Sequence, residues 1–434
     1  MRNPSRSPIR WLIALVLGSF WFLPALILTA AILLAGLLLH FDATGLSARI
    51  GEQDWPLAMA GKSAQALASV LVGLHAALVT LYFSITLLVL TIAASNLGVR
   101  LIDRWIGRGV TRFTLGLLLG GLGWSLVTLW AIDPDASGAP VARGTLTALL
   151  GYTIVVIGWL AAALHDLGRA IHVDTAIARL GEEGSEDLSF FQETEPGDAP
   201  DFTGPSFLAR REGYIEGIDF DEILEQAVRR GQRLRLDVGV GRYVMKGEQL
   251  GRFEDGCDPE SCALIARQYS YGDFRANAQG VVFQIRLLVE IAARALSPAV
   301  NDFYTGLACC DRLGLILAAQ ARDARPPGWI GGRLYLVDHE FKGLFGHPLS
   351  AFREAAATYP SVAIRMIEIY GRAAALHPAE DVLPSVRETI VRWAREMRDH
   401  ALIHAELERD RIELRAAYDK ALAAAAVDTA GAGG

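Results

Sequence analysis

The stretch that decides the fold is Thr145–Leu180, which reads TLTALLGYTIVVIGWLAAAL up to Leu164 and HDLGRAIHVDTAIARL after it. The first part is an apolar run of about 20 residues, the length that an α-helix needs to cross a bilayer. The second part is charged, and no proline separates it from the first. We therefore expect one helix that leaves the membrane and enters water, with membrane segments before it and a soluble domain after it.

The composition divides at the same place. The chain has 434 residues, of which 52% are hydrophobic and 21% charged, and the long apolar runs crowd into the part before residue 170. The formal net charge of −7 gives no reason to expect nucleic-acid binding. The four cysteines are too sparse for the disulfide framework of a small secreted protein, so we expect free thiols.

Four apolar runs are long enough to span a bilayer, and they cover about residues 11–39, 64–94, 113–132 and 145–164. The first run follows a basic leader, which leaves a cleaved signal peptide as an alternative. Its apolar stretch is about twice as long as the core of a signal peptide, which favours an uncleaved anchor. We therefore expect residues 1–180 to form a membrane domain of four helices.

Basic residues alternate between the connections of these runs. Three arginines precede the first run, and four arginines lie in the connection 95–112 with one acid, Asp103. The connections 40–63 and 133–144 instead carry more acids than bases. Under the positive-inside rule, this pattern predicts that both chain termini lie in the cytoplasm.

Two features within the runs are candidates for function. Gly116 and Gly120 have the spacing that lets two helices approach closely, which indicates packing within the bundle or, alternatively, a contact between two copies. His75, Tyr82 and Thr86 share one face of the second run. This run either sits centrally in the bundle or lines a solute path, with His75 as an ionisable group at membrane depth.

The part that follows the runs divides by composition. Residues 181–203 are acidic and contain Gly and Pro, which predicts an extended linker. Residues 204–256 predict a small β-rich module, with one helix from Phe220 to Arg230 behind the capping residue Asp219. Residues 257–425 predict a helical domain, and residues 426–434 a disordered tail. The expected fold is a polytopic α-helical membrane bundle followed by a cytoplasmic α+β domain that is mostly helical.

A polar group in the predicted helical domain is a second candidate site. Arg286, Glu290 and Arg294 recur every four residues on an otherwise apolar helix. The other members lie in the turn after this helix and in the next helix: Ser297, Asn301, Asp302 and Asp311. The group is either a structural network of ion pairs and a helix cap, or a contact with a ligand or a subunit.

Three segments together resemble a known family. They are GYIEGIDFDEIL from Gly213, the glycine hairpin with VMKGEQL from Val244, and above all ARALSPAVNDFYTGLACCDRLG from Ala293. They resemble the domain of unknown function 2254 family of predicted bacterial membrane proteins, in which four spans also precede such a domain. Phe303 stands where we expect a proline from the family pattern. The resemblance implies an inner-membrane location and no particular activity.

A separate likeness concerns the hairpin alone. The spacing from Gly241 to Leu250 is similar to the hairpin of biotinyl- and lipoyl-type barrel domains, but Lys246 does not occupy the position of their cofactor-bearing lysine. We therefore expect no cofactor. Cys257 and Cys262 lack a second pair of zinc ligands, and no pairing of nucleophile and base is recognisable, so we expect no metal and no catalytic residues.

Three hypotheses for function follow, and the third, an enzyme, has no catalytic signature behind it. The leading one is a non-enzymatic integral inner-membrane protein, surrounded by lipid and assembled as a homo-oligomer, whose cytoplasmic domain binds a protein or small-molecule partner. The alternative is an oligomeric channel or transporter for a small solute or ion, with His75, Tyr82 and Thr86 on its path.

Overall fold

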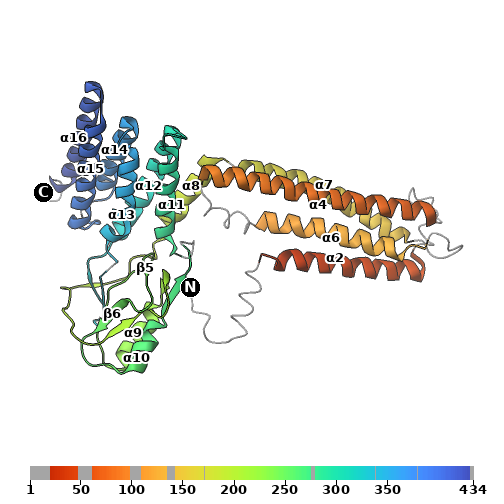
Figure 1. Ribbon diagram of the computed structural model, residues 1–434, viewed down its shortest axis with the longest axis horizontal. Helices are drawn as coiled ribbons and strands as arrows, with labels where there is room; N and C mark the ends of the chain where they lie inside the picture. Colours follow the sequence, from red (N-terminus) through yellow and green to blue (C-terminus); the bar gives the residue numbers. More distant parts are fainter. Residues whose placement is uncertain are drawn as a thin grey trace. The chain divides into compact units, whose positions relative to one another are not determined.

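The computed structural model describes residues 20–46, 61–97, 109–133, 142–170, 172–274, 279–337, 339–378 and 380–430. The chain folds into two compact units, Met1–His172 and Val173–Gly434. The long apolar helices belong to the first unit, and the sheets and the remaining helices to the second (Figure 1).

The first unit is a helical bundle. Within its described residues, four helices are long and apolar enough to cross a membrane. They are α2 (Phe22–Phe41), α4 (Gly61–Leu97), α6 (Gly109–Ala131) and α7 (Arg143–Ala170). These helices correspond to the four predicted runs, and residues 11–19 of the first run lie outside the described residues. Leu33, Leu87 and Val155 are more than 60% exposed, as expected of helix surfaces that contact lipid.

Glycines let α6 approach α2 closely. A Cβ atom added to Gly116 would lie 2.6 Å from Cδ1 of Ile27, and one added to Gly120 would lie 3.2 Å from Cβ of Ala31. Both neighbours belong to α2 of the same chain. The geometry therefore supports packing within the bundle as the role of the Gly116–Gly120 spacing, rather than a contact between copies.

A buried carboxylate joins the end of α2 to the start of α7. Asp42 is 1% exposed and begins η1 (Asp42–Leu46), the π-helical turn that follows α2. Its Oδ1 atom accepts a hydrogen bond of 3.0 Å from the Gly144 amide. Its Oδ2 atom accepts hydrogen bonds of 2.8 and 2.7 Å from the amide and hydroxyl of Thr145. Asp42 thus caps the N-terminus of α7, where free amides and the helix dipole favour a negative charge.

The expectation of one continuous helix from Thr145 to Leu180 is wrong. Helix α7 ends at Ala170, and α8 (Val173–Glu186) begins after His172, which is also the boundary between the two units. Gly168 in the last turn of α7 and the β-branched Ile171 at the junction both lower the helix propensity here. Asp174 then lies in the first turn of α8, where the helix dipole favours a carboxylate.

The second unit contains two small sheets. One has six strands in the order β1-β8-β9-β4-β6-β2, and the other has three in the order β5-β3-β7. The pairing of β4 with β9 is parallel, and the other pairings are antiparallel. The strands are β1 (Glu195–Pro196), β2 (Ser206–Leu208), β3 (Gly213–Ile218), β4 (Leu234–Leu236), β5 (Tyr243–Val244), β6 (Gln249–Phe253), β7 (Tyr269–Gly272), β8 (Gly328–Ile330) and β9 (Leu334–Leu336).

Two short helices accompany the sheets, α9 (Phe220–Arg229) and α10 (Pro259–Ala266). Ile223 of α9 and Ile265 of α10 are buried in one core cluster with Phe207, Leu234 and Phe253 of the six-stranded sheet. The predicted cap of α9 is confirmed, because Oδ1 of Asp219 accepts a hydrogen bond of 3.1 Å from the Glu222 amide.

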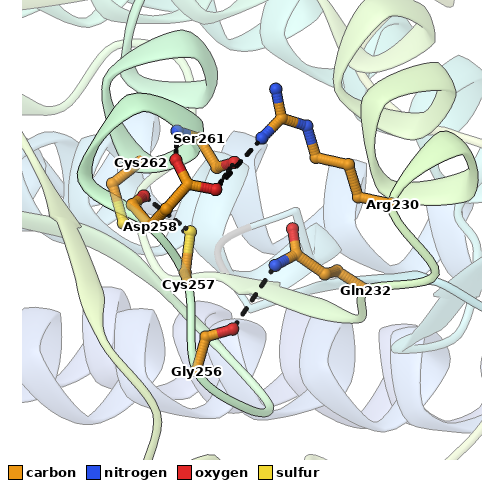
Figure 2. A network of polar contacts seen from close by, with 7 residues as sticks. All are labelled: Arg230, Gln232, Gly256, Cys257, Asp258, Ser261 and Cys262. Atoms are coloured by element: carbon orange, nitrogen blue, oxygen red, sulfur yellow. Dashed lines mark hydrogen bonds and ion pairs between the residues drawn. The ribbon is translucent and has the colours of Figure 1, made fainter.

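Asp258 caps α10 in the same way and anchors a polar network (Figure 2). Its carboxylate accepts hydrogen bonds of 2.7 Å from both the amide and the hydroxyl of Ser261, and it lies 3.4 Å from Nη1 of Arg230. The thiols of Cys257 and Cys262 lie beside it; Sγ of Cys262 donates a hydrogen bond of 3.3 Å to Sγ of Cys257, and the two form no disulfide.

The second unit contains six further helices, of which the first two precede β8: α11 (Val281–Ala295), α12 (Phe303–Asp323), α13 (Phe341–Ala356), α14 (Pro360–Ala375), α15 (Pro384–His404) and α16 (Glu408–Ala430). Helix α8 packs against α11 and α12, and α14 packs against both α15 and α16. Helices α14, α15 and α16 lie side by side (Figure 1). Most side chains of α11 are buried, as its apolar sequence predicts.

The structure differs from the predicted boundaries in three places. Residues 181–186 belong to α8, and the aromatic rings of Phe190, Phe191 and Phe202 are buried, so the predicted linker is packed. Strands β7, β8 and β9 come from the predicted helical domain. Helix α16 continues to Ala430 through part of the predicted tail, and residues 431–434 lie outside the described residues. The acidic composition of residues 181–203 favoured an extended linker, although this segment contains three phenylalanines that are buried. Pairing between distant strands leaves no signal in the local sequence.

Candidate functional site

Hydrogen bonds within residues 294–305 stabilise the predicted turn after α11. The Ser297 hydroxyl donates a hydrogen bond of 2.7 Å to the Arg294 carbonyl, and the Asn301 amide donates one of 2.9 Å to the Ser297 carbonyl. Asp302 caps α12 by accepting hydrogen bonds of 3.1 and 2.7 Å from the amide and hydroxyl of Thr305. Ser297 and Asp302 therefore satisfy helix ends, as the structural interpretation expects. The side chain of Asn301 accepts a hydrogen bond of 3.0 Å from the Tyr359 hydroxyl.

The charged members of the same predicted group are directed to different partners. Nη1 of Arg286 donates a hydrogen bond of 2.6 Å to the carbonyl of Gly241, beside β5. Glu290 and Arg294 form an ion pair of 4.0 Å along α11. Asp311 accepts two hydrogen bonds, of 2.9 and 3.2 Å, from Arg365 of α14. The structure thus distributes the group over several contacts and does not bring it together as one site.

The polar face of α4 points into the first unit. His75 is fully buried, Tyr82 is 3% exposed and Thr86 is half-buried. Nδ1 of His75 lies 2.9 Å from the Leu71 carbonyl and 3.1 Å from Oγ of Ser125 on α6. The Ser125 hydroxyl donates to the Gly121 carbonyl, so it can only accept from His75. The imidazole proton therefore sits on Nδ1, and the lone pair on Nε2.

The Nε2 side of His75 packs against a glycine. Nε2 is buried and has no hydrogen-bond partner within the described residues. A Cβ atom added to Gly121 would lie 2.4 Å from it, and the ring of Tyr152 on α7 lies 6.4 Å away between centroids. This geometry favours a central packing position for α4 over a face that lines an open path.

Sequence reasoning missed a cavity within the second unit. It has a volume of about 230 Å³. Its wall is formed by the segment after α8, by β3 and the start of α9, by the start of α11 and by His339. Its lining residues include Phe190, Glu216, Phe220, Val240, Gln279, Val281 and His339.

Two side chains of this cavity are buried and unpartnered. Gln279 is 3% exposed and His339 is 8% exposed. Both amide atoms of Gln279 and both ring nitrogens of His339 lack hydrogen-bond partners among the residues that the structure describes. Leaving such a group unpaired costs about 1–3 kcal/mol, so folded proteins rarely tolerate it. Each of these atoms has almost no accessible surface, so a partner inside the cavity reaches it only after the side chain turns toward the cavity.

Aromatic rings hold His339 in place and keep it neutral. Its ring stacks on Phe190, with centroids 5.7 Å apart, and meets Phe220 edge to face at 5.1 Å. Burial lowers the pKa of His339 to about 4, so the ring is uncharged near neutral pH. A neutral imidazole offers one hydrogen-bond donor and one acceptor.

The carboxylate of Asp187 occupies the N-terminus of α11, where an anion would otherwise bind. The free amide of Val281, at the start of α11, donates a hydrogen bond of 2.9 Å to Oδ2 of Asp187. Gly280 has a φ of 58°, and a Cβ atom there would lie 2.5 Å from the same oxygen. Glu216 also lines the cavity, and its carboxyl group lies against Gly272 of β7. The helix N-terminus, which often binds anions, is thus already occupied by a carboxylate.

Local sequence held one weak signal for this site. A pair of phenylalanines at 190 and 191 within an acidic stretch indicates burial, because such side chains are rarely left in water. Gln279 and His339 come from segments far apart in the chain and carry no motif. Their meeting depends on tertiary packing between distant segments, which no local pattern reports.

Comparison with known proteins adds a family. A family model described as "Predicted membrane protein (DUF2254)" matches residues 18–372. Uncharacterised proteins of Mycobacterium bovis and Mycobacterium tuberculosis are 30% identical to the chain, over 70% of this chain and 60% of each relative. The chain therefore spans about 60% of the length of these relatives. No solved structure matches the chain.

Proposed function

Because the chain belongs to the domain of unknown function 2254 family of predicted membrane proteins, we propose that it is a multi-pass inner-membrane protein whose C-terminal unit binds a small organic ligand. The observation that carries this proposal is the cavity of about 230 Å³ with the unpartnered side chains of Gln279 and His339 in its wall. A ligand that hydrogen-bonds to both side chains recovers a free-energy cost that the empty cavity leaves in place.

The arginine distribution supplies the orientation in this proposal. Both termini lie in the cytoplasm, so the second unit and its cavity sample cytoplasmic solutes. Assembly as a homo-oligomer belongs to the same proposal. Three well-exposed apolar side chains support this assembly because they offer contact surface. They are Ile403 on α15, Leu407 between the helices and Ile412 on α16. The mass of the purified protein in nanodiscs tests the assembly, and a monomer mass contradicts it.

Ligand binding is tested on the full-length protein in nanodiscs. Its melting temperature is measured against a library of small polar organic compounds, next to the double variant Gln279→Leu/His339→Phe. The variant removes the unpaired polar atoms and keeps the cavity's apolar wall. We expect compounds that raise the melting temperature of the unaltered protein and leave that of the variant unchanged.

The matched control is Gln226→Leu, because Gln226 bonds to Glu222 along α9 and has no place in the cavity. Equal shifts in the double variant and the unaltered protein would locate the binding elsewhere and overturn the proposal. A library without any stabilising compound, together with a double variant that is more stable than the unaltered protein, also overturns it. The buried polar atoms would then be a cost without a ligand.

One observation keeps the channel or transporter as a second candidate. The lone pair of His75 Nε2 is buried within the first unit and has no partner among the described residues, so it could take a proton or a cation. Flux into liposomes measures this activity. A flux that is unchanged in His75→Ala removes that residue from the path, and liposomes without flux remove the candidate.

A further inference from the structure

We infer that the ligand of the cavity is a small, planar, uncharged molecule that carries a hydrogen-bond donor and an acceptor side by side, as a carboxamide, a lactam or the edge of a nitrogen heterocycle does. The inference rests on the proposed function and specifies its ligand. It follows from the charge, the hydrogen-bonding capacity and the wall of the cavity.

Charge excludes an anionic ligand. Asp187 lies beside Gly280 and Val281 of the wall, and the amide of Val281 is already bound to it. His339 is neutral in its buried position and cannot supply a compensating positive charge. The described residues of the wall include no lysine or arginine, so a phosphate or carboxylate placed here would lie near Asp187 without a cationic partner.

Hydrogen-bonding capacity excludes a simple cation. The Gln279 amide presents two N–H donors and one carbonyl acceptor, and the neutral ring of His339 presents one donor and one acceptor. An ammonium or amidinium group donates only, so it would leave the N–H groups of both side chains unpaired. A carboxamide or lactam edge both donates and accepts, and can therefore pair with the Gln279 amide through two antiparallel hydrogen bonds once that side chain turns toward the cavity.

The apolar part of the wall and the cavity volume limit the size and shape of the ligand. Phe190, Phe220 and Val240 supply apolar surface, and two of these side chains are aromatic. Flat molecules stack on such rings with a gain of about 0.5–1.5 kcal/mol beyond area burial. The volume of about 230 Å³ is below the roughly 300–1,000 Å³ of pockets for drug-sized ligands, so the ligand has one or two rings.

Three benzene derivatives separate these requirements because they share one ring and differ in one polar group. Benzamide donates and accepts without charge, benzoate is an anion that only accepts, and benzamidinium is a cation that only donates. Their binding to the full-length protein in nanodiscs is measured by calorimetry, with empty nanodiscs as the reference. We expect benzamide to bind at least tenfold more tightly than either of the other two.

One substitution turns the preference around. Gln279→Glu keeps the size of the side chain and replaces the amide with a group that only accepts, so this variant should bind benzamidinium more tightly than benzamide. Gln226→Glu on α9 is the matched control and should keep the order of the unaltered protein. Should Gln279→Glu lower the melting temperature too far for titration, Gln279→Leu replaces it and is expected to lose benzamide binding at least tenfold.

The outcomes distinguish the inference from the proposed function. Tighter binding of benzoate or benzamidinium than of benzamide overturns the inferred ligand class and leaves a ligand-binding cavity. The same holds if none of the three binds but other library compounds bind in a manner that depends on Gln279 and His339. If no compound of any class binds in that manner, the proposed function fails together with the inference.

Discussion

Gly121 on α6 admits the imidazole of His75 into the bundle. A Cβ atom at position 121 would lie 2.4 Å from Nε2 of His75 and 3.1 Å from Cε1 of Tyr152. We expect Gly121→Ala to lower the free energy of unfolding of the bundle by about 1–3 kcal/mol, the usual effect of overpacking a tight interior. The melting temperature of the protein in nanodiscs measures the effect.

A second substitution tests whether His75 is the cause. Adding His75→Ala to Gly121→Ala removes the ring that the new methyl group would strike, so most of the lost stability should return. Gly151→Ala on α7 is the control, because nothing lies within 4 Å of a Cβ atom there. If the two substitutions are simply additive, this contact does not restrict residue 121.

His339 couples the stability of the second unit to pH. Its pKa falls from 6.5 to about 4 on folding, so between these values the unfolded chain binds a proton that the native protein does not. The stability from this group is therefore complete above about pH 6.5 and is lost as the pH falls towards 4, by about 3 kcal/mol in all.

Substitution of His339 isolates this contribution. His339→Phe keeps a ring between Phe190 and Phe220 and cannot titrate, so its melting temperature should fall less between pH 7 and pH 5 than that of the unaltered protein. His347→Phe, at an exposed position on α13, is the control. Equal pH dependence of all three proteins would show that His339 does not carry the effect.

At the scale of elements, local chemistry predicted single helices well. The cap at Asp219 and the charges of the first and last turns placed a helix at residues 220–230, and α9 runs from Phe220 to Arg229. The four apolar runs likewise became four helices, because a long apolar segment has few other structures open to it. These signals lie within one element and need no knowledge of its neighbours.

Pairing and packing between elements were the part that could not be predicted. Strand β4 pairs in parallel with β9, which follows it by about a hundred residues, and each strand is only three residues long. The polar group on α11 was predicted from spacing along one helix; Glu290 and Arg294 do pair along it, but Arg286 bonds to Gly241 outside the helix. Gln279 and His339 share a cavity for the same reason: tertiary packing placed them there.

Helix α8 packs closely against α11 and α12, and hydrogen bonds from α12 add to this packing. A Cβ atom added to Gly184 would lie 2.6 Å from Cδ1 of Ile316. Nε2 of Gln320 donates hydrogen bonds of 3.2 and 2.9 Å to the carbonyls of Gly184 and Asp187. We expect Gly184→Val to loosen α8, because the larger side chain cannot fit without displacing one of the two helices.

Hydrogen exchange measures this loosening. Amides of α8 should exchange at least tenfold faster in Gly184→Val, while those of the six-stranded sheet keep their rates. Gly346→Val on α13 is the matched control, because the atom nearest to a Cβ there is 3.9 Å away, in the side chain of Lys342. Unchanged protection of α8 would mean that this close approach does not hold the helix in place.

At the scale of the whole molecule, the orientation in the membrane decides which solutes reach the cavity. Four arginines in the connection 95–112 and the acidic connection 133–144 predict that the C-terminus is cytoplasmic. Green fluorescent protein fused after Gly434 should therefore fluoresce. Alkaline phosphatase inserted within residues 133–144 should be active, and within residues 95–108 inactive, because the enzyme needs the oxidising periplasm.

The arginines themselves provide the control for this prediction. Replacing Arg100, Arg104, Arg108 and Arg112 with glutamine removes the bias without changing the apolar runs, so the two phosphatase insertions should lose their contrast. Active phosphatase fused at Gly434 of the unaltered protein would contradict the predicted orientation. The cavity would then face the periplasm, and its ligand would have to come from outside the cell. The hydrogen-bonding argument for an uncharged ligand would stand, because it depends on Gln279 and His339 and not on the side of the membrane.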